Sequence, residues 1–131
     1  ERPAGVASVG FHILHMRGVI DRLFTYAKDE ALNEEQLEAL RQEKEVPAEI
    51  VTASTLVDAL RLQVQKAVEQ LKATPESSLT EARALGRKRI PTTVMGLLFH
   101  TAEHCQRHVG QLLVTARVVG FGASAGLPAG Q

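Results

Sequence analysis

The chain has 131 residues, which is enough for one hydrophobic core and one domain. Lysine plus arginine and aspartate plus glutamate balance at 15 each, so the basic excess typical of nucleic-acid-binding proteins is absent and we expect no nucleic-acid partner. The single cysteine excludes an internal disulfide and favours a reducing, cytoplasmic location, and we expect no membrane partner because no apolar run reaches the roughly 18 residues of a membrane-spanning helix.

The first predicted helix runs from Val9 to about Lys28 and carries two histidines. Ser8 stands before it in the position of an N-cap. His12 and His15 fall on the side of the helix that its apolar residues occupy. Those apolar residues are Phe11, Val19, Leu23 and Tyr26. The pattern therefore predicts that this helix carries both imidazoles on its buried face.

The middle of the chain is predicted to form two further helices without diagnostic residues. Leu32–Glu45 has the composition of a short, solvated helix, with Asn33 as its N-cap. Pro47–Ala73 has the pattern of a long amphipathic helix that begins with a first-turn proline. We expect a loop over Thr74–Ser78 and a short helical turn over Leu79–Leu85.

A basic run and a long final helix complete the predicted elements. The run Arg87–Arg89 is typical of a solvated loop, and the alternative is that it anchors an acidic substrate or a thiol cofactor. Pro91–Thr93 indicates the start of the final helix, which is expected to run to about Val119 and to end at Gly120. The small residues of 120–131 predict a flexible tail.

The final helix contains three histidines, each four residues from the next. A step of four is about 400° on a helix, so His100, His104 and His108 share one face, on which Gln111 also lies. His100 and His108 are about 12 Å apart along the axis, which is too far for both to hold one ion. His104 therefore pairs either with His108 or with His100, and the latter pair gives, with Glu103, the H-x-x-E-H pattern of certain zinc proteases.

Together these elements predict an all-α protein with three long amphipathic helices. We expect a single domain over residues 1–119. Three long helices leave an apolar groove unless a fourth covers it. We expect the fourth helix to come from a segment that precedes this chain or from the second subunit of a homodimer.

Two stretches of the sequence resemble the DinB/YfiT-like superfamily of metalloenzymes. They are SVGFHILHMRGVIDRL in the first helix and PTTVMGLLFHTAEHCQRHVGQLLVTARVVG at the last one. The resemblance implies an up-down four-helix bundle that holds a nickel or zinc ion with three histidines. One of these comes from the second helix of the bundle and two come from a late H-x-x-x-H.

By position, the resemblance assigns the late pair of ligands to His104 and His108. These stand in the sequence H-x-x-x-H-x-G-Q, which ends with Gln111. Because the pair 104/108 supplies the ligands in this interpretation, His100 and Gln111 are expected beside the ligands rather than on the metal.

The resemblance assigns the remaining ligand to His15. A capping serine usually stands seven residues before this ligand, and Ser8 has that position here, with His12 as the fallback ligand. The usual first helix of the family has no counterpart before Ser8. We therefore expect that the natural N-terminus is missing from this chain.

Three protein nitrogens leave coordination positions open for water or substrate, as in catalytic metal sites. The resemblance implies a function, because characterised relatives are thiol-dependent S-transferases and isomerases that use bacillithiol, mycothiol or glutathione. We expect a metal-dependent transferase that activates a low-molecular-weight thiol and acts on a small-molecule substrate. The alternatives are a metal-dependent hydrolase and a non-catalytic helical stress-response or interaction module. Cys105, turned about 100° from His104, is expected to pack without a chemical role.

Overall fold

The computed structural model describes residues 1–43 and 52–124, with the side chains of these residues up to Gly120. Within these ranges the chain forms four α-helices and a two-stranded hairpin. The helices are α1 (Val9–Ala27), α2 (Glu34–Gln42), α3 (Ala53–Ala73) and α4 (Val94–Ser124), and the strands are β1 (Ala82–Leu85) and β2 (Ile90–Thr93). The prediction of an all-α bundle is confirmed, with the hairpin as a small addition.

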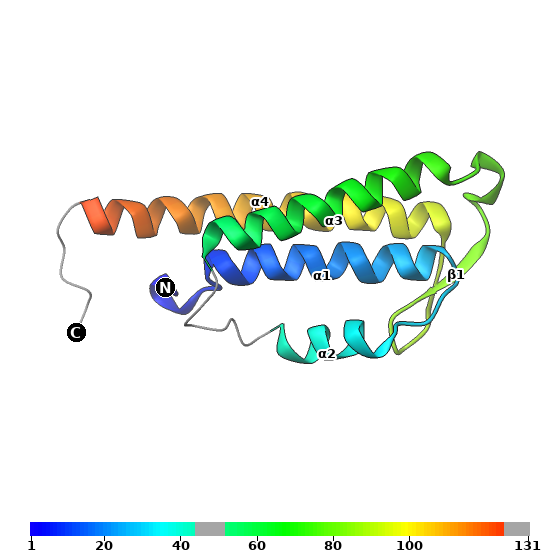
Figure 1. Ribbon diagram of the computed structural model, residues 1–131, viewed down its shortest axis with the longest axis horizontal. Helices are drawn as coiled ribbons and strands as arrows, with labels where there is room; N and C mark the ends of the chain where they lie inside the picture. The colour runs from blue at the N-terminus through cyan, green and yellow to red at the C-terminus, as the bar shows by residue number, and fades with distance from the viewer. Residues whose placement is uncertain (44–51, 125–131) are drawn as a thin grey trace.

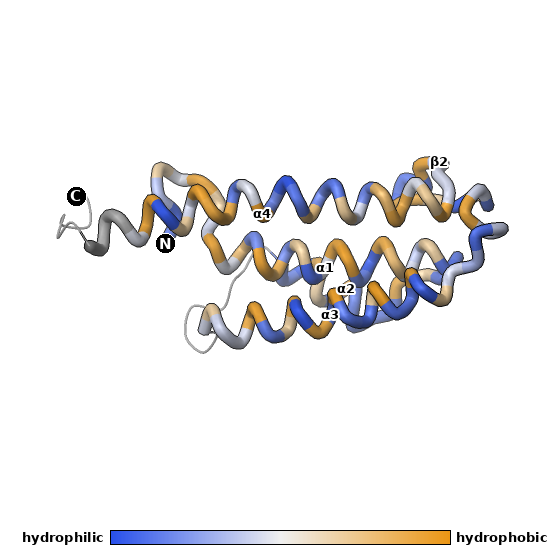
Figure 2. The backbone as a smooth tube through the Cα atoms, turned by 90° about the horizontal axis from the view of Figure 1, so that it is seen from above, coloured by the Kyte–Doolittle hydropathy of each residue, from blue (hydrophilic) through white to orange (hydrophobic). Residues whose placement is uncertain are grey.

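Helix α1 is the centre of the bundle. It contacts α4, α3 and α2, and successive helices reverse their direction, as an up-down bundle requires (Figure 1). Seen from above, α1 lies between α4 and α3 (Figure 2). The long helices α3 and α4 therefore flank α1, while the short α2 covers another side of it.

The core lies where the C-terminal half of α1 meets its neighbours. Val19, Leu23 and Ala27 of α1 pack against Leu97 of α4, which is only 1 % exposed. A second cluster joins α1 to α3 and consists of Ile20, Phe24 and Ala67. These contacts bury the apolar stripe of α1 on two sides, which explains its place at the centre.

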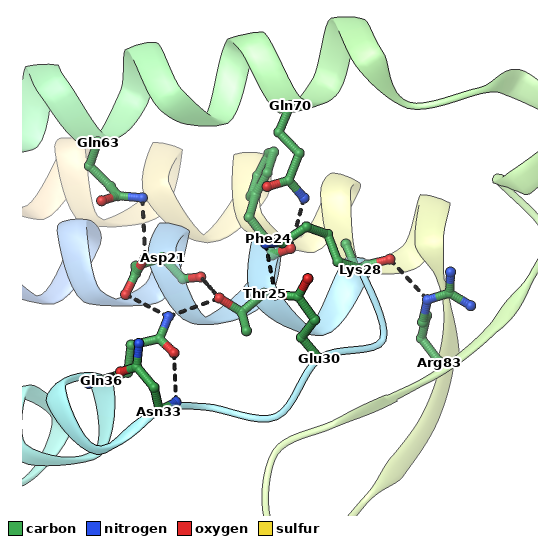
Figure 3. Close-up of polar contacts among 11 residues, drawn as sticks. Asp21, Phe24, Thr25, Lys28, Glu30, Asn33, Gln36, Gln63, Gln70 and Arg83 are labelled. Atoms are coloured by element: carbon green, nitrogen blue, oxygen red, sulfur yellow. Dashed lines mark hydrogen bonds and ion pairs between the residues drawn. The ribbon is translucent and has the colours of Figure 1, made fainter.

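Polar side chains hold α2 and α3 on α1 (Figure 3). Asn33 caps α2 in a reciprocal arrangement with Gln36, as its sequence predicts. The amide nitrogen of Gln36 also donates to Asp21 Oδ2 at 2.9 Å and to Thr25 Oγ1 at 2.8 Å, both on α1. Gln63 of α3 reaches the other oxygen of Asp21 at 3.5 Å. Asp21 is thus the point at which both neighbours are fixed to the central helix.

The predicted helical turn over Leu79–Leu85 is wrong, because β1 pairs with β2 in an antiparallel hairpin there. Gly86 and Arg89 adopt left-handed φ angles of 67° and 48°, which close the turn between the strands. The guanidinium of Arg83 donates to the carbonyl of Ala27 at 2.9 Å and fastens the hairpin to the end of α1 (Figure 3). With only four residues in each strand, no alternation of apolar residues could indicate this hairpin.

The ends of the long helices also differ from expectation. Helix α4 begins at Val94, because Pro91–Thr93 lies in β2, and the hydroxyl of Thr93 accepts from Gly96 N at 3.1 Å as a cap. It continues through Gly120 to Ser124, so the predicted end at Val119 is wrong. A glycine inside a helix costs about 1 kcal/mol and need not end it.

Three predicted boundaries lie outside the described residues. Helix α2 ends at Gln42 with Glu43 as its C-cap, and the predicted end at Glu45 falls in the undescribed residues 44–51. Helix α3 begins at Ala53 with Thr52 as N-cap, and the predicted start at Pro47 falls in the undescribed residues 44–51. The predicted tail is helical as far as Ser124, and its remaining residues, 125–131, are likewise undescribed.

Candidate metal centre

Four histidines meet where the N-terminal half of α1 crosses the middle of α4. His12 and His15 come from α1, and His104 and His108 come from α4. The ring centroids of His15 and His108 are 4.5 Å apart, and those of His104 and His108 are 4.6 Å apart. Residues that are about 90 positions apart in the sequence therefore form one cluster, as the hydrogen bond between His15 and His104 shows.

Ser8 and Phe11 stabilise the α1 side of this cluster. The hydroxyl of Ser8 accepts a hydrogen bond from Phe11 N at 3.1 Å, which confirms its predicted role as N-cap. The Phe11 ring stacks on His15, with centroids 5.4 Å apart and planes 9° from parallel. The imidazole of His15 is thus held from one side by an apolar ring.

His15, His104 and His108 form the group that could hold a metal ion among the described residues. Their nearest ligand atoms all lie within 4.8 Å of one another, and Nε2 of His15 is 2.9 Å from Nε2 of His104. The structure therefore brings together the three residues that the sequence predicted as ligands. Metal binding by them stays a prediction.

His12, the fallback ligand, lies beside this group and not in it. It is 4 % exposed, and its Nδ1 is 2.9 Å from Nδ1 of His108. Because one of these nitrogens must donate and the other accept, His12 constrains the tautomer and the orientation of His108. The other ring nitrogen of His108, Nε2, is left to bind an ion.

His100 and Glu103 lie on the outer side of α4. The side chains of both are more than 40 % exposed, and His100 Nδ1 is 3.6 Å from Glu103 Oε2. Glu103 also pairs with Arg107. His100 contacts the His104 ring at 5.6 Å between centroids but does not belong to the three-histidine group. The arrangement thus favours the pair 104/108 over the H-x-x-E-H pair 100/104.

Gln111 is exposed, and its side chain makes no hydrogen bond to a described residue. Its predicted place beside the ligands stays a prediction.

Burial favours the neutral form of three of the clustered imidazoles. It is the largest cause that lowers the pKa of His12, His104 and His108, and the pKa of His108 falls to about 4. The neighbouring His15 lowers all three values further, because two imidazolium charges at this distance would repel each other. Neutral imidazoles are the form that binds metal, so these residues are ready to do so at neutral pH.

The residues present fit a divalent ion. Zinc bonds of about 2.0–2.1 Å to two imidazoles place the nitrogens about 3.3 Å apart in a tetrahedral site. The 2.9 Å between His15 and His104, and the 4.8 Å limit for the group, lie on either side of that separation. Imidazole ligands suit zinc and nickel.

Glu43 is a residue of this site that the sequence did not reveal. It directly follows α2 as its C-cap, and its Oε2 lies 3.2 Å from Nδ1 of His15. Arg22 of α1 donates to the Oε1 of Glu43 through both terminal nitrogens, at 3.3 and 3.2 Å. Burial raises the pKa of Glu43, but its contacts with His15 and Arg22 outweigh burial and hold the pKa below its ordinary value. No local sequence signal connects Glu43 to the histidines.

Two other predicted features lie away from the chemistry. Cys105 packs against the cluster of Ile20 and Phe24, and burial raises the pKa of its thiol, as expected for an unreactive cysteine. Arg87–Arg89 is exposed in the hairpin turn, at the opposite end of α1 from the histidines (Figure 1). The position of this run supports the solvated-loop interpretation.

No described helix is both long and apolar enough to cross a membrane.

Comparison with known proteins identifies the family. No curated protein and no solved structure matches the chain. A family model of the DinB superfamily matches residues 1–112, a range that contains α1, α2, α3, the larger part of α4 and all five histidines. The chain therefore belongs to the DinB superfamily.

Proposed function

We propose that this protein is a metal-dependent enzyme whose nickel or zinc ion is held by His15, His104 and His108. The observation that carries the proposal is the convergence of three imidazoles from two helices, with all ligand atoms within 4.8 Å of one another. The reaction proposed is an S-transfer in which a low-molecular-weight thiol loses its proton and its sulfur displaces a leaving group, with the bonding electron pair, from a small electrophilic substrate.

The number of ligands supports a catalytic site. Structural zinc sites are closed by four protein ligands, whereas catalytic sites use three and leave a position open. A divalent ion there would supply a Lewis acid that lowers the pKa of a thiol or water beside it, so that a nucleophile forms near neutral pH.

The chain's own residues would keep the ligand imidazoles neutral and correctly oriented. Burial holds His104 and His108 neutral, so that their lone pairs are not lost to protons. His12 fixes the ring of His108, and Phe11 covers one face of His15. These contacts limit the rotation of the ligands, which is what a preorganised site requires.

A hydrolase would use the same three histidines with water as the nucleophile. The H-x-x-E-H form of this alternative has little support, because His100 lies outside the group and Glu103 is paired with Arg107 at the surface. The proposal also includes a homodimer and a cytoplasmic location.

The test is the metal content of protein purified without an affinity tag or added metal. We expect about one nickel or zinc ion per chain in the wild type and none in the His104→Ala/His108→Ala double variant. His100→Ala is the matched control, because it removes an imidazole from the same face of α4 but outside the group. Elemental analysis gives the stoichiometry.

The outcomes distinguish the proposed metal site from the protease-like pair and from the non-catalytic module. Metal that is lost in the double variant and kept in His100→Ala supports the site, and thiols can then be assayed against electrophiles. A wild type that stays empty when nickel and zinc are offered contradicts the metalloenzyme and favours the non-catalytic helical module. Loss of metal in His100→Ala, which keeps both His104 and His108, would favour the protease-like pair 100/104.

A further inference from the structure

We propose that Glu43 is a positioning residue, whose carboxylate is held by Arg22 and orients the His15 imidazole so that Nε2 faces the other two ligands. This inference rests on the metal site of the proposed function and adds to it a residue from α2. It makes the site depend on three helices, where the ligands themselves come only from α1 and α4.

The first support is the geometry of His15. Its Nε2 points to His104 at 2.9 Å, while its Nδ1 is buried and has no hydrogen bond to a described residue. The Glu43 carboxylate is 3.2 Å from this Nδ1, so a small rotation of either side chain completes a hydrogen bond. A carboxylate on the nitrogen opposite the metal fixes the tautomer and raises the basicity of the ligand.

The second support is that Glu43 is itself fixed. The side chains of Arg22 and Glu43 are both 11 % exposed, and two nitrogens of the guanidinium meet one carboxylate oxygen. This leaves Oε2 for His15, although one nitrogen of Arg22 also approaches it at 3.5 Å. An arginine that holds a carboxylate in this way is a more rigid support than solvent.

The third support is the space that the chain reserves for the pair. A Cβ atom at Gly18 would lie 2.6 Å from Nη1 of Arg22 and 2.6 Å from Oε1 of Glu43. Both distances are too short for non-bonded atoms, so any side chain at Gly18 must displace the pair. Glycine in mid-helix costs about 1 kcal/mol relative to alanine. Here it gives room for the contact between α1 and α2.

Other carboxylates of α2 are not equivalent to Glu43. Glu38 also pairs with an arginine, Arg41, through an oxygen at 2.6 Å, but both partners are at least half exposed and belong to the same helix. Glu38 makes no contact with a histidine. It therefore provides a matched control that removes a carboxylate–arginine pair without touching the metal site.

The experiment measures the affinity for zinc and for nickel by competition with a coloured chelator. We expect Glu43→Ala to weaken binding by about 10- to 100-fold, the usual loss when the partner of a ligand histidine is removed. Glu43→Gln, which keeps the shape and an accepting oxygen, should lose less. Glu38→Gln should bind as the wild type does. Circular dichroism shows whether each variant is folded, and Glu43→Gln serves as the test if Glu43→Ala is not.

A second pair of variants tests whether the space beside Gly18 is needed for the contact between Arg22 and Glu43. Gly18→Ala should weaken metal binding several-fold in a folded protein, because the new methyl group displaces Arg22 and Glu43. Gly110→Ala is the control, since a Cβ atom there meets nothing within 4 Å. Equal affinity in the two variants would contradict the role of the Arg22–Glu43 pair.

The tautomer of His15 is a readout that does not need metal. In the metal-free wild type at pH 8, long-range ¹H–¹⁵N spectra should show His15 with its proton on Nδ1, and the other tautomer should gain population in Glu43→Ala. Metal binding by the wild type with unchanged affinity in Glu43→Ala overturns this inference alone. A wild type that binds neither ion overturns the proposed function and this inference together.

Discussion

The interface between α1 and α4 has two halves with opposite chemistry. In the apolar half, Val19, Leu23 and Ala27 pack against Leu97 and leave almost no exposed surface. In the histidine half, four imidazoles fill the same interhelical space, and among the described residues their polar partners are each other and Glu43. One pair of helices therefore carries both the contacts that stabilise the fold and the group that can hold an ion.

The difference shows where stability and function lie in this bundle. Burial of apolar surface contributes about 25 cal/mol per Å², so the apolar half holds the helices together. Buried polar groups contribute little when they are paired and cost free energy when they are not. The histidine half is thus expected to be the weaker part of the interface until an ion satisfies its nitrogens.

The largest effect is expected from Leu97→Ala in the apolar half. Leu97 is 1 % exposed, and removal of a fully buried leucine side chain costs about 2–5 kcal/mol. Urea denaturation of the metal-free protein measures this loss. Leu113→Ala on the same helix is the control, because that side chain belongs to a residue that is 52 % exposed. A similar loss in both variants would contradict the assignment of the core to the apolar half.

The next effect is the stabilisation of the histidine half by metal. At a free ion concentration 100 times the dissociation constant, binding to the native state alone adds about 2.7 kcal/mol. We expect zinc or nickel to raise the melting temperature of the wild type and to leave that of His104→Ala/His108→Ala unchanged. Leu97→Ala should gain the same increment as the wild type. An equal gain in the double variant would mean that the ion binds elsewhere.

A smaller effect is expected from acid. Burial lowers the pKa of His12, His104 and His108 in the folded protein, so the unfolded chain binds more protons below pH 6.5, and stability falls as the pH falls. The contribution of His108 is complete above its unfolded pKa of 6.5 and is lost as the pH approaches its folded value of about 4. For the partly solvated cluster we expect a loss on the order of 1 kcal/mol between pH 7 and pH 5.

The measurement is the free energy of unfolding of metal-free protein across this pH range. His108→Gln removes the imidazole whose pKa burial lowers to about 4 and should flatten the slope. The range from pH 7 to pH 5 lies above the ordinary pKa of the carboxyl groups, whose titration would otherwise add to the loss. A slope that is equal in wild type and variant would contradict a partly buried, neutral His108.

Local periodicity was enough to predict the long helices and the shared face of the late histidines, whereas the choice of His104 and His108 as ligands came from the family resemblance. His104 and His108 lie one helical turn apart, so any helix over this stretch places them side by side. The caps at Ser8 and Asn33 could be predicted for the same reason, because a cap binds backbone atoms within three residues of itself. Interactions between residues within one helical turn can be predicted from a short stretch of sequence, because both partners lie in that stretch.

The sequence by itself thus determined the all-α class, the amphipathic helices and a family likeness that pointed to His15. Only the tertiary structure decided that His15 faces His104 while His12 turns to His108, because both lie on the same side of α1 and the crossing of the helices separates them. It alone brought Glu43 to the site, through the return of α2 along α1. Periodicity records which face of a helix is buried, and the identity of the group that it meets depends on packing between distant segments.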